Sequence, residues 1–155
     1  MSKKIKHLVT AALFAALVFV CTKFTSIPLF GGVGYVHIGD TFVYLAAAFL
    51  PLPYPIFAAA IGGLLADILS GFAMYALPTA IIKGLMALVI GKQKKYLGLI
   101  SAWIILVGGY YITELIIYRS FAVPLPGLLW NSVQALVSSV CYLLLFVAIK
   151  PHIKK

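Results

Sequence analysis

Charged side chains within apolar segments are the most reactive feature of this sequence. Asp67 and Lys83 lie in two hydrophobic segments separated by one short turn, and Asp40 and Glu114 lie near the ends of two others. A charge in the middle of a membrane helix costs about 2.5 to 3.5 kcal/mol even on lenient insertion scales, so it normally faces a partner, a cavity or a ligand. We therefore predict one polar pocket that gathers these four charges.

The alternative is a set of structural ion pairs, such as Asp67 with Lys83, together with charges that reach the membrane interface from helix ends. A second polar signal favours the pocket, because Asn131, Gln134 and Ser138 recur on one face of the last apolar segment. Amides, carboxylates and aromatic rings suit a planar heterocyclic ligand, although an interfacial aromatic belt explains the rings equally well. The aromatic residues concerned are Tyr75, Tyr110, Tyr111, Tyr118 and Trp130.

The composition excludes several classes of protein. With 155 residues, 64% hydrophobic and 10% charged, the chain is too apolar for a water-soluble domain and is predicted to be an integral membrane protein. Its net charge of +9 comes from short clusters between apolar segments, which is typical of membrane topology and not of nucleic-acid binding. Cys21 and Cys141 lie in apolar runs without metal-ligand spacing. No catalytic motif is present, so we predict no enzyme activity, no metal and no cofactor.

Six apolar segments approach the ~20 residues that cross about 30 Å of hydrocarbon, except the second, which is short. They run over residues 8–22, 38–50, 55–71, 77–91, 97–117 and 128–149. The sequence thus predicts an all-α membrane protein, a single domain over 1–155 made of a compact bundle of six transmembrane helices. Nine lysines near the chain ends and at 92–95 oppose only Lys23 and Arg119 on the other side, so both termini are predicted to be cytoplasmic.

Three connections then face outward, at 23–37, 72–76 and 118–127. The first is long and contains Gly31, Gly32 and Gly34, which give a loop the backbone freedom of a lid. The second is expected to be a turn that extends from Gly71 to Pro78.

Small residues form stripes on two segments. In the first segment Ala11, Ala12, Ala15 and Ala16 form overlapping small-xxx-small pairs, which allow another helix to approach closely. The third segment has the same spacing at Ala58, Gly62, Ala66 and Ser70. Because one stripe is enough to pack a short bundle, we expect the alanine stripe of the first segment to contact another protein.

Three stretches together carry a family resemblance: residues 34–40 (GYVHIGD), 66–71 (ADILSG) and 78–84 (PTAIIKG). With the alanine stripe, their order along the chain resembles the substrate-binding S component of energy-coupling factor (ECF) transporters. The resemblance implies a multi-pass protein of the prokaryotic plasma membrane that binds a vitamin from the outside. It also implies partners, namely a coupling transmembrane subunit, which would contact the alanine stripe, and two ATPase subunits.

The resemblance places the ligand at the first outer loop and at the outer ends of the last three spans. The predicted substrate-binding residues are Tyr35, His37, Asp40, Asp67, Tyr75, Lys83, Glu114, Asn131 and Gln134. The stretch from His37 to Thr41 is most similar to the branch for pyridoxine-type or hydroxymethylpyrimidine ligands. Riboflavin or a thiamin precursor is the alternative ligand, and a proton-coupled carrier or a membrane enzyme that uses Asp67, Lys83 and Glu114 is the alternative function.

Overall fold

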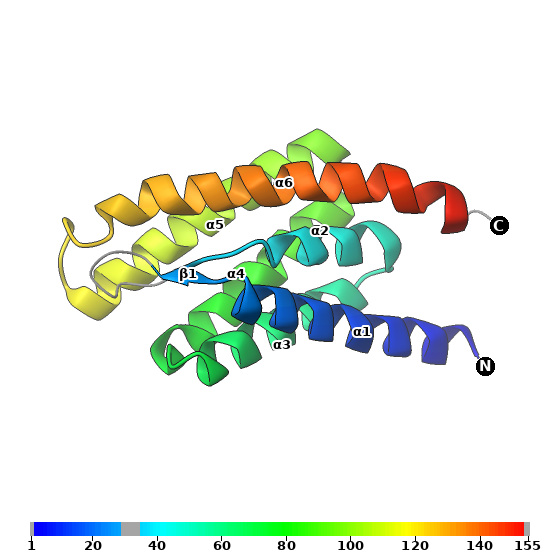
Figure 1. Ribbon diagram of the computed structural model, residues 1–155, viewed down its shortest axis with the longest axis horizontal. Coiled ribbons are helices and arrows are strands. Elements are labelled where there is room, and N and C mark those ends of the chain that lie inside the picture. Colours follow the sequence, from blue (N-terminus) through cyan, green and yellow to red (C-terminus); the bar gives the residue numbers. More distant parts are fainter. Residues whose placement is uncertain (1, 29–34, 154–155) are drawn as a thin grey trace.

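The computed structural model describes residues 2–28 and 35–153, with side chains as far as Lys150. Over these residues the chain forms six helices and one short β-hairpin (Figure 1). In chain order they are α1 (Lys3–Phe24), β1 (Ile27–Pro28), β2 (Tyr35–Val36), α2 (Asp40–Phe49), α3 (Tyr54–Leu69), α4 (Ala73–Lys92), α5 (Lys95–Tyr118) and α6 (Leu125–Ile153). The two strands are antiparallel, with Ile27 opposite Val36.

The helices follow the six predicted apolar segments, so the all-helical class is confirmed. Four of the described helices, α1, α4, α5 and α6, are long and apolar enough to cross a membrane. The other two, α2 with 10 residues and α3 with 16, are apolar but shorter. The short second segment was expected, whereas the hairpin was not, because two-residue strands leave no alternating pattern to detect.

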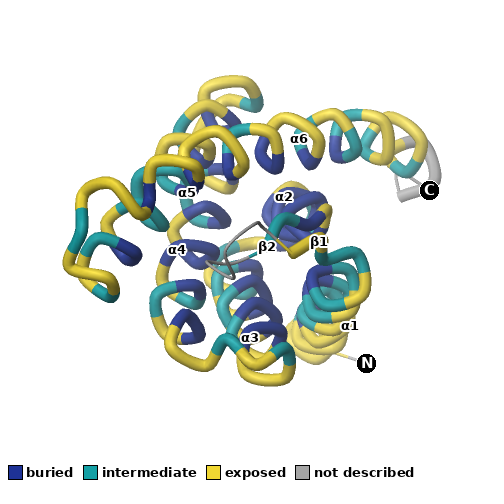
Figure 2. The backbone as a smooth tube through the Cα atoms, turned by 60° about the vertical axis from the view of Figure 1, so that its left-hand side comes forward, coloured by how far each residue is buried: buried dark blue, intermediate teal, exposed yellow. Residues whose placement is uncertain are grey.

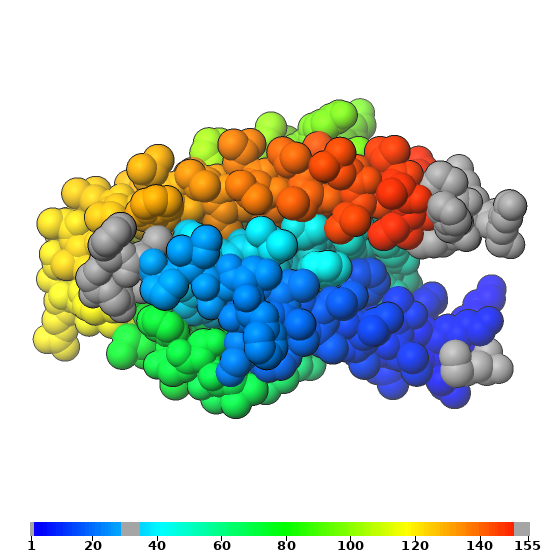
Figure 3. Space-filling view, in the orientation of Figure 1, coloured from blue at the N-terminus to red at the C-terminus, as the bar shows by residue number. Residues whose placement is uncertain are grey.

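The shortest helix lies in the centre of the bundle. Seven of the ten residues of α2 are buried, and Val43, Tyr44 and Ala46 have no exposed surface. The helix contacts α1, α3, α4 and α6, which surround it in Figure 2, and α6 and α1 flank it on the face shown in Figure 3. A helix that is apolar on all sides is normally buried. Its amino-terminal residue, Asp40, is therefore held at a fixed depth inside the protein.

A close contact between backbones joins α1 to α3. A Cβ atom placed on Gly62 would lie 2.6 Å from the carbonyl oxygen of Ala15 and 2.7 Å from the Cβ of Val18, so only glycine allows this approach. Ala58 and Ala66, one turn away on either side, are also buried. The small-residue stripe of α3 thus packs inside the bundle, as small residues do between membrane helices.

The expected boundary between the third and fourth segments is wrong. Pro78 was expected to end a turn, but α4 begins at Ala73 and Pro78 lies inside it, so most of the predicted loop 72–76 is helical. Pro78 is the sixth residue of α4, so its missing N–H costs the helix one hydrogen bond, to the carbonyl group of Met74, and the helix continues past it. The predicted lid glycines Gly31, Gly32 and Gly34 lie outside the described residues.

The two ends of the bundle differ in charge. The N- and C-terminal ends of the chain lie together at one end of Figure 1, with the basic residues that begin α1 and end α4. The hairpin, the turn between α3 and α4 and the connection from α5 to α6 lie at the opposite end. Lys154 and Lys155, which the sequence assigns to the basic end, lie outside the described residues. We call the opposite end, with the hairpin, the hairpin end.

Candidate ligand-binding site

A buried ion pair lies beside the hairpin. Lys83 of α4 donates to Oδ1 of Asp40, the first residue of α2, and their side chains are 1% and 0% exposed. Gln134 of α6 donates from Nε2 to the other carboxylate oxygen of Asp40 at 2.7 Å. Three helices therefore meet at one carboxylate. Lys83 pairs with Asp40 and not with Asp67, the partner considered in the structural alternative.

A glycine of α3 makes room for the lysine. A Cβ on Gly63 would lie 2.7 Å from Cδ of Lys83 and 2.9 Å from the methyl group of Thr79. Any larger residue at this position would displace the aliphatic stem of Lys83. The sequence offered only a weak sign of this role, since Gly62 and Gly63 are adjacent and only the first fits the small-residue stripe.

His37 joins the hairpin to the same network. Its backbone N–H donates to Oε1 of Gln134 at 3.1 Å, and its Nδ1 accepts from the N–H of Gly39 at 3.0 Å. Burial, reinforced by the nearby positive charge of Lys83, lowers the pKa of His37 to about 3, against a smaller opposing effect of Asp40. The imidazole is thus neutral at physiological pH and adds no positive charge to the site.

The pKa of His37 predicts a pH dependence of stability. In the unfolded chain His37 takes up a proton near its ordinary pKa of 6.5, whereas in the folded protein it stays neutral, so the unfolded state binds more protons below pH 6.5. The contribution of His37 to thermal stability should therefore be lost progressively as the pH falls from 6.5 to 5. A His37→Asn variant should lack this loss, so the stability difference between wild type and His37→Asn should change over this window, whereas His7→Gln, at the other end of the molecule, should keep the wild-type slope. Equal slopes in all three proteins would contradict the assignment.

Tyr35 connects the hairpin to α3. Its hydroxyl donates to Oδ1 of Asp67 at 2.5 Å, and its ring centroid lies 5.1 Å from that of Phe72 and 5.7 Å from that of His37. Burial and the neighbouring carboxylate of Asp67 raise the pKa of Tyr35, so it remains a donor. Asp67 is 4% exposed, and its other carboxylate oxygen, Oδ2, is buried without a hydrogen-bond partner among the described residues.

The third carboxylate, that of Glu114 on α5, lies against the first turns of α6. Glu114 is 6% exposed and Asn131 is 8% exposed. A Cβ on Gly127 would lie 3.2 Å from Oε2 of Glu114 and 3.6 Å from Nδ2 of Asn131, so both polar groups face the same glycine. Gly127 is a site residue that the sequence did not identify, because a glycine just before an apolar run resembles any other helix start.

Hydroxyl groups of aromatic residues link α4 to α5. Tyr75 donates to the hydroxyl of Tyr118 at 3.2 Å, and the hydroxyls of Thr79 and Tyr110 lie 2.9 Å apart. Thr79, one helical turn before Lys83, is a second residue that sequence reasoning missed. The nine predicted binding residues thus lie at the hairpin end of the bundle, and their role in binding a ligand stays a prediction.

The four alanines of the α1 stripe differ in how far they are buried. Ala11 is 7% exposed and packs against Ala46, Leu50 and Ala58, and Ala15 is half-buried beside Gly62. The other two, Ala12 and Ala16, are exposed. The predicted partner contact therefore concerns Ala12 and Ala16 first.

Comparisons with known proteins agree with this architecture. Residues 2–151 match the family described as ECF-type riboflavin transporter, S component. The chain is 31% identical over 144 residues to the thiamine precursor transporter HmpT of Lactococcus lactis subsp. cremoris, which covers 90% of this chain and 84% of that protein. It is 30% identical over 109 residues to an uncharacterised protein of Pyrococcus woesei, over 65% of this chain and 73% of that protein. No solved structure gives a significant match.

These matches decide the class of the protein. The family consists of transporter subunits, so the prediction that the chain is not an enzyme is confirmed, and the membrane-enzyme alternative is wrong. The family match covers nearly the whole chain, and with it the resemblance drawn from residues 34–40, 66–71 and 78–84 is confirmed. The chain belongs to the ECF-type riboflavin transporter S component family, whose members serve vitamin uptake.

Proposed function

We propose that this protein captures a small protonatable aromatic compound, a thiamin precursor of the hydroxymethylpyrimidine type, at the hairpin end of the bundle. The observation that carries this proposal is the excess of acidic groups there. Asp40, Asp67 and Glu114 are all buried at this end, and Lys83 is the one cation buried with them among the described residues.

The charge balance favours a cationic or protonatable ligand. Lys83 compensates Asp40, which leaves the carboxylates of Asp67 and Glu114 in surroundings of low dielectric without a second cation. Buried charges are costly unless they are paired. An aminopyrimidine carries an amino group beside a ring nitrogen that takes up a proton, so it can donate two parallel hydrogen bonds to one carboxylate. The neutral ring system of riboflavin supplies no such charge.

The named relative supports the same ligand class. HmpT is described as a thiamine precursor transporter, and it matches this chain over most of both lengths. A pyridoxine-type ligand is the second candidate, because its pyridine nitrogen can also be protonated next to a carboxylate.

The proposed topology follows from the charges at the two ends. The basic end, with both termini, would lie in the cytoplasm of a prokaryotic cell, and the hairpin end would face outward. In this arrangement all six helices of the single domain 1–155 lie within the bilayer. Two of them are shorter than the others, and the shortest, α2, is enclosed by its neighbours. ECF S components work with an energy-coupling module. Here that module would comprise a coupling transmembrane subunit and two ATPases that drive import.

Titration calorimetry on the purified protein tests the ligand class. We expect hydroxymethylpyrimidine to bind most tightly, pyridoxine less tightly, and riboflavin weakly or not at all. Affinity should fall as the pH rises above the ligand's own pKa, because the deprotonated ring loses its attraction to the carboxylates. Tight binding of riboflavin with no pH dependence would refute the charge argument. It would instead favour riboflavin, the ligand that the family's description names.

A neutral substitution at Glu114 tests the site itself. Glu114→Gln keeps the shape but removes the charge, so it should weaken binding by about 1 to 3 kcal/mol while the melting temperature of the empty protein changes little. Lys92→Gln, a charge change at the basic end, is the matched control and should bind like wild type. Full affinity in Glu114→Gln, Lys83→Met and the double variant Asp67→Asn/Lys83→Met would reject the assigned pocket.

A further inference from the structure

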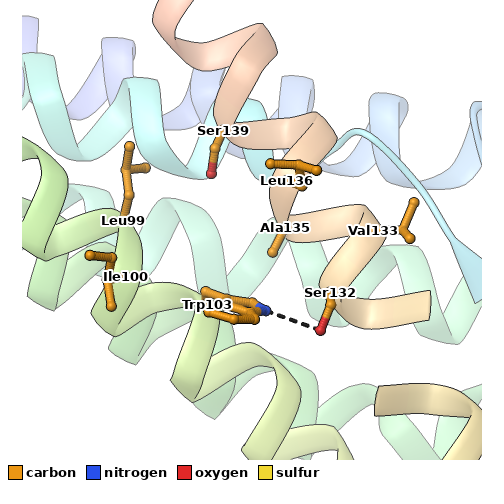
Figure 4. A pocket seen from close by; sticks show the side chains of 8 residues that line it. All are labelled: Leu99, Ile100, Trp103, Ser132, Val133, Ala135, Leu136 and Ser139. Atoms are coloured by element: carbon orange, nitrogen blue, oxygen red, sulfur yellow. Dashed lines mark hydrogen bonds between the residues drawn. The ribbon is translucent and has the colours of Figure 1, made fainter. Parts of the chain in front are cut away.

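A groove between α5 and α6 lies apart from the proposed ligand site. It has a volume of about 410 Å³ and is lined mainly by apolar side chains, among them Leu99, Trp103, Ala135 and Leu136, with Ser139 at its edge. Figure 4 shows these side chains converging from both helices, with Nε1 of Trp103 donating to Oγ of Ser132 at 3.1 Å. None of the nine predicted binding residues lines the groove. Its volume lies within the range of roughly 300 to 1,000 Å³ of small-molecule sites.

Two lysines converge at the basic end of the same helix pair. The Nζ atoms of Lys95 on α5 and Lys150 on α6 lie 5.1 Å and 5.5 Å from the centroid of one ring, that of Phe146. Lys95 precedes Leu99 by one helical turn, and Phe146 follows Ser139 by two, so the lysines continue the line of the groove toward the basic end. The apolar groove and the pair of lysines thus follow one another along the same helix pair.

The protein supplies no acidic side chain to neutralise these lysines. The chain has three acidic residues, and all of them are buried at the hairpin end. Within residues 2–28 and 35–150 the only salt bridge joins Lys83 to Asp40. No acidic side chain of the protein therefore competes with an anionic ligand for Lys95 and Lys150.

We propose that the groove between α5 and α6 is a binding site for an anionic phospholipid, with the phosphate between Lys95 and Lys150 and one acyl chain along Leu99, Trp103 and Leu136. Basic pockets between membrane helices on the cytoplasmic side attract anionic headgroups in this way. A neutral lipid would satisfy only the apolar part. A helix of a partner protein is the competing occupant of the groove, and cross-linking at position 139 tests for it. The proposal does not depend on the identity of the vitamin ligand.

Native mass spectrometry in detergent tests the headgroup. Wild-type protein should retain dioleoyl phosphatidylglycerol in preference to dioleoyl phosphatidylcholine, which has the same chains. The variant Lys95→Gln/Lys150→Gln should bind phosphatidylglycerol roughly 30-fold more weakly, since each lysine near the membrane surface contributes a factor of about five. Lys3→Gln/Lys4→Gln removes two charges from the same end of the molecule and should bind like wild type. Equal retention of the two lipids, or equal losses in the two double variants, would overturn the proposal.

The acyl chain is tested at Ser139. A Ser139→Trp substitution fills the groove and leaves both lysines in place, so it should remove the preference for phosphatidylglycerol while binding of the vitamin ligand is unchanged. A Ser139→Cys variant that cross-links to the coupling subunit in the assembled transporter, with phosphatidylglycerol bound normally by Ser139→Trp, would assign the groove to that partner and contradict a lipid site.

Discussion

Replacing Lys83 with methionine is expected to lower the stability of the empty protein by about 3 to 5 kcal/mol, because the change leaves the fully buried carboxylate of Asp40 without its cation. For a chain of this size the melting temperature should fall by roughly 6 to 20 °C. Gln134 still donates to Asp40, but one amide hydrogen bond does not replace a neutralising charge. Thermal unfolding in detergent, followed by tryptophan fluorescence or by circular dichroism, measures the effect.

Two double variants identify the partner of Lys83. Asp40→Asn/Lys83→Met removes both charges of the pair and should recover much of the lost stability. Asp67→Asn/Lys83→Met removes a different carboxylate, which is bonded to Tyr35, and should recover little. If Asp67→Asn/Lys83→Met is the more stable of the two, the carboxylate that stabilises the protein by pairing with Lys83 is that of Asp67 and not that of Asp40.

Tryptophan at Ala12 or Ala16 is expected to reduce uptake roughly fivefold or more and to leave the isolated protein intact. Both alanines are exposed on α1, so a large side chain there meets only lipid in the isolated subunit. At an interface with the coupling subunit the same side chain would overpack the contact at a cost of about 1 to 3 kcal/mol, equivalent to a factor of roughly 5 to 160 in affinity. Uptake of labelled ligand in cells that contain the coupling module measures the first effect, and calorimetry on the isolated protein measures the second.

Ala11→Trp is the matched control on the same helix. Ala11 is buried against Ala46, Leu50 and Ala58, so tryptophan there should lower both the melting temperature and ligand affinity. If Ala12→Trp and Ala16→Trp instead behave like Ala11→Trp, the stripe belongs to the folding core. If they leave uptake unchanged, α1 does not meet a partner through this face.

The helices could be predicted from the sequence because burial in a membrane requires long apolar runs. Such runs can be recognised in the sequence without knowledge of the tertiary contacts. The proximity of the charges could also be predicted. In the predicted topology, the same half of the membrane contains Asp40, Asp67, Lys83 and Glu114. Their pairing could not be predicted. Whether Lys83 meets Asp40 or Asp67 depends on how the helices are rotated about their axes, and for α3 this rotation is reflected in the close contacts of Gly62 with α1 and of Gly63 with Lys83.

Several local features could not be predicted from the sequence either. The helix containing Pro78 starts one turn earlier than the apolar run does, and the strands at Ile27 and Tyr35 are held by contacts to distant residues rather than by their own preference. The convergence of Lys95 and Lys150 on Phe146 arises in the same way, because the positions are more than fifty residues apart in the sequence.

The contact between α1 and α3 gives the protein a mechanical property. Gly62 lets the two backbones touch near mid-length, and Nζ of Lys23 at the end of α1 donates to the carbonyl oxygen of Leu69 at 2.6 Å, two residues beyond Asp67. Because α1 and α3 are joined at these two points, we expect them to move together. A displacement of α1 near Ala12 and Ala16 would then also move Asp67 and the tyrosine bonded to it, so that a contact at one end of the molecule would change the geometry at the other.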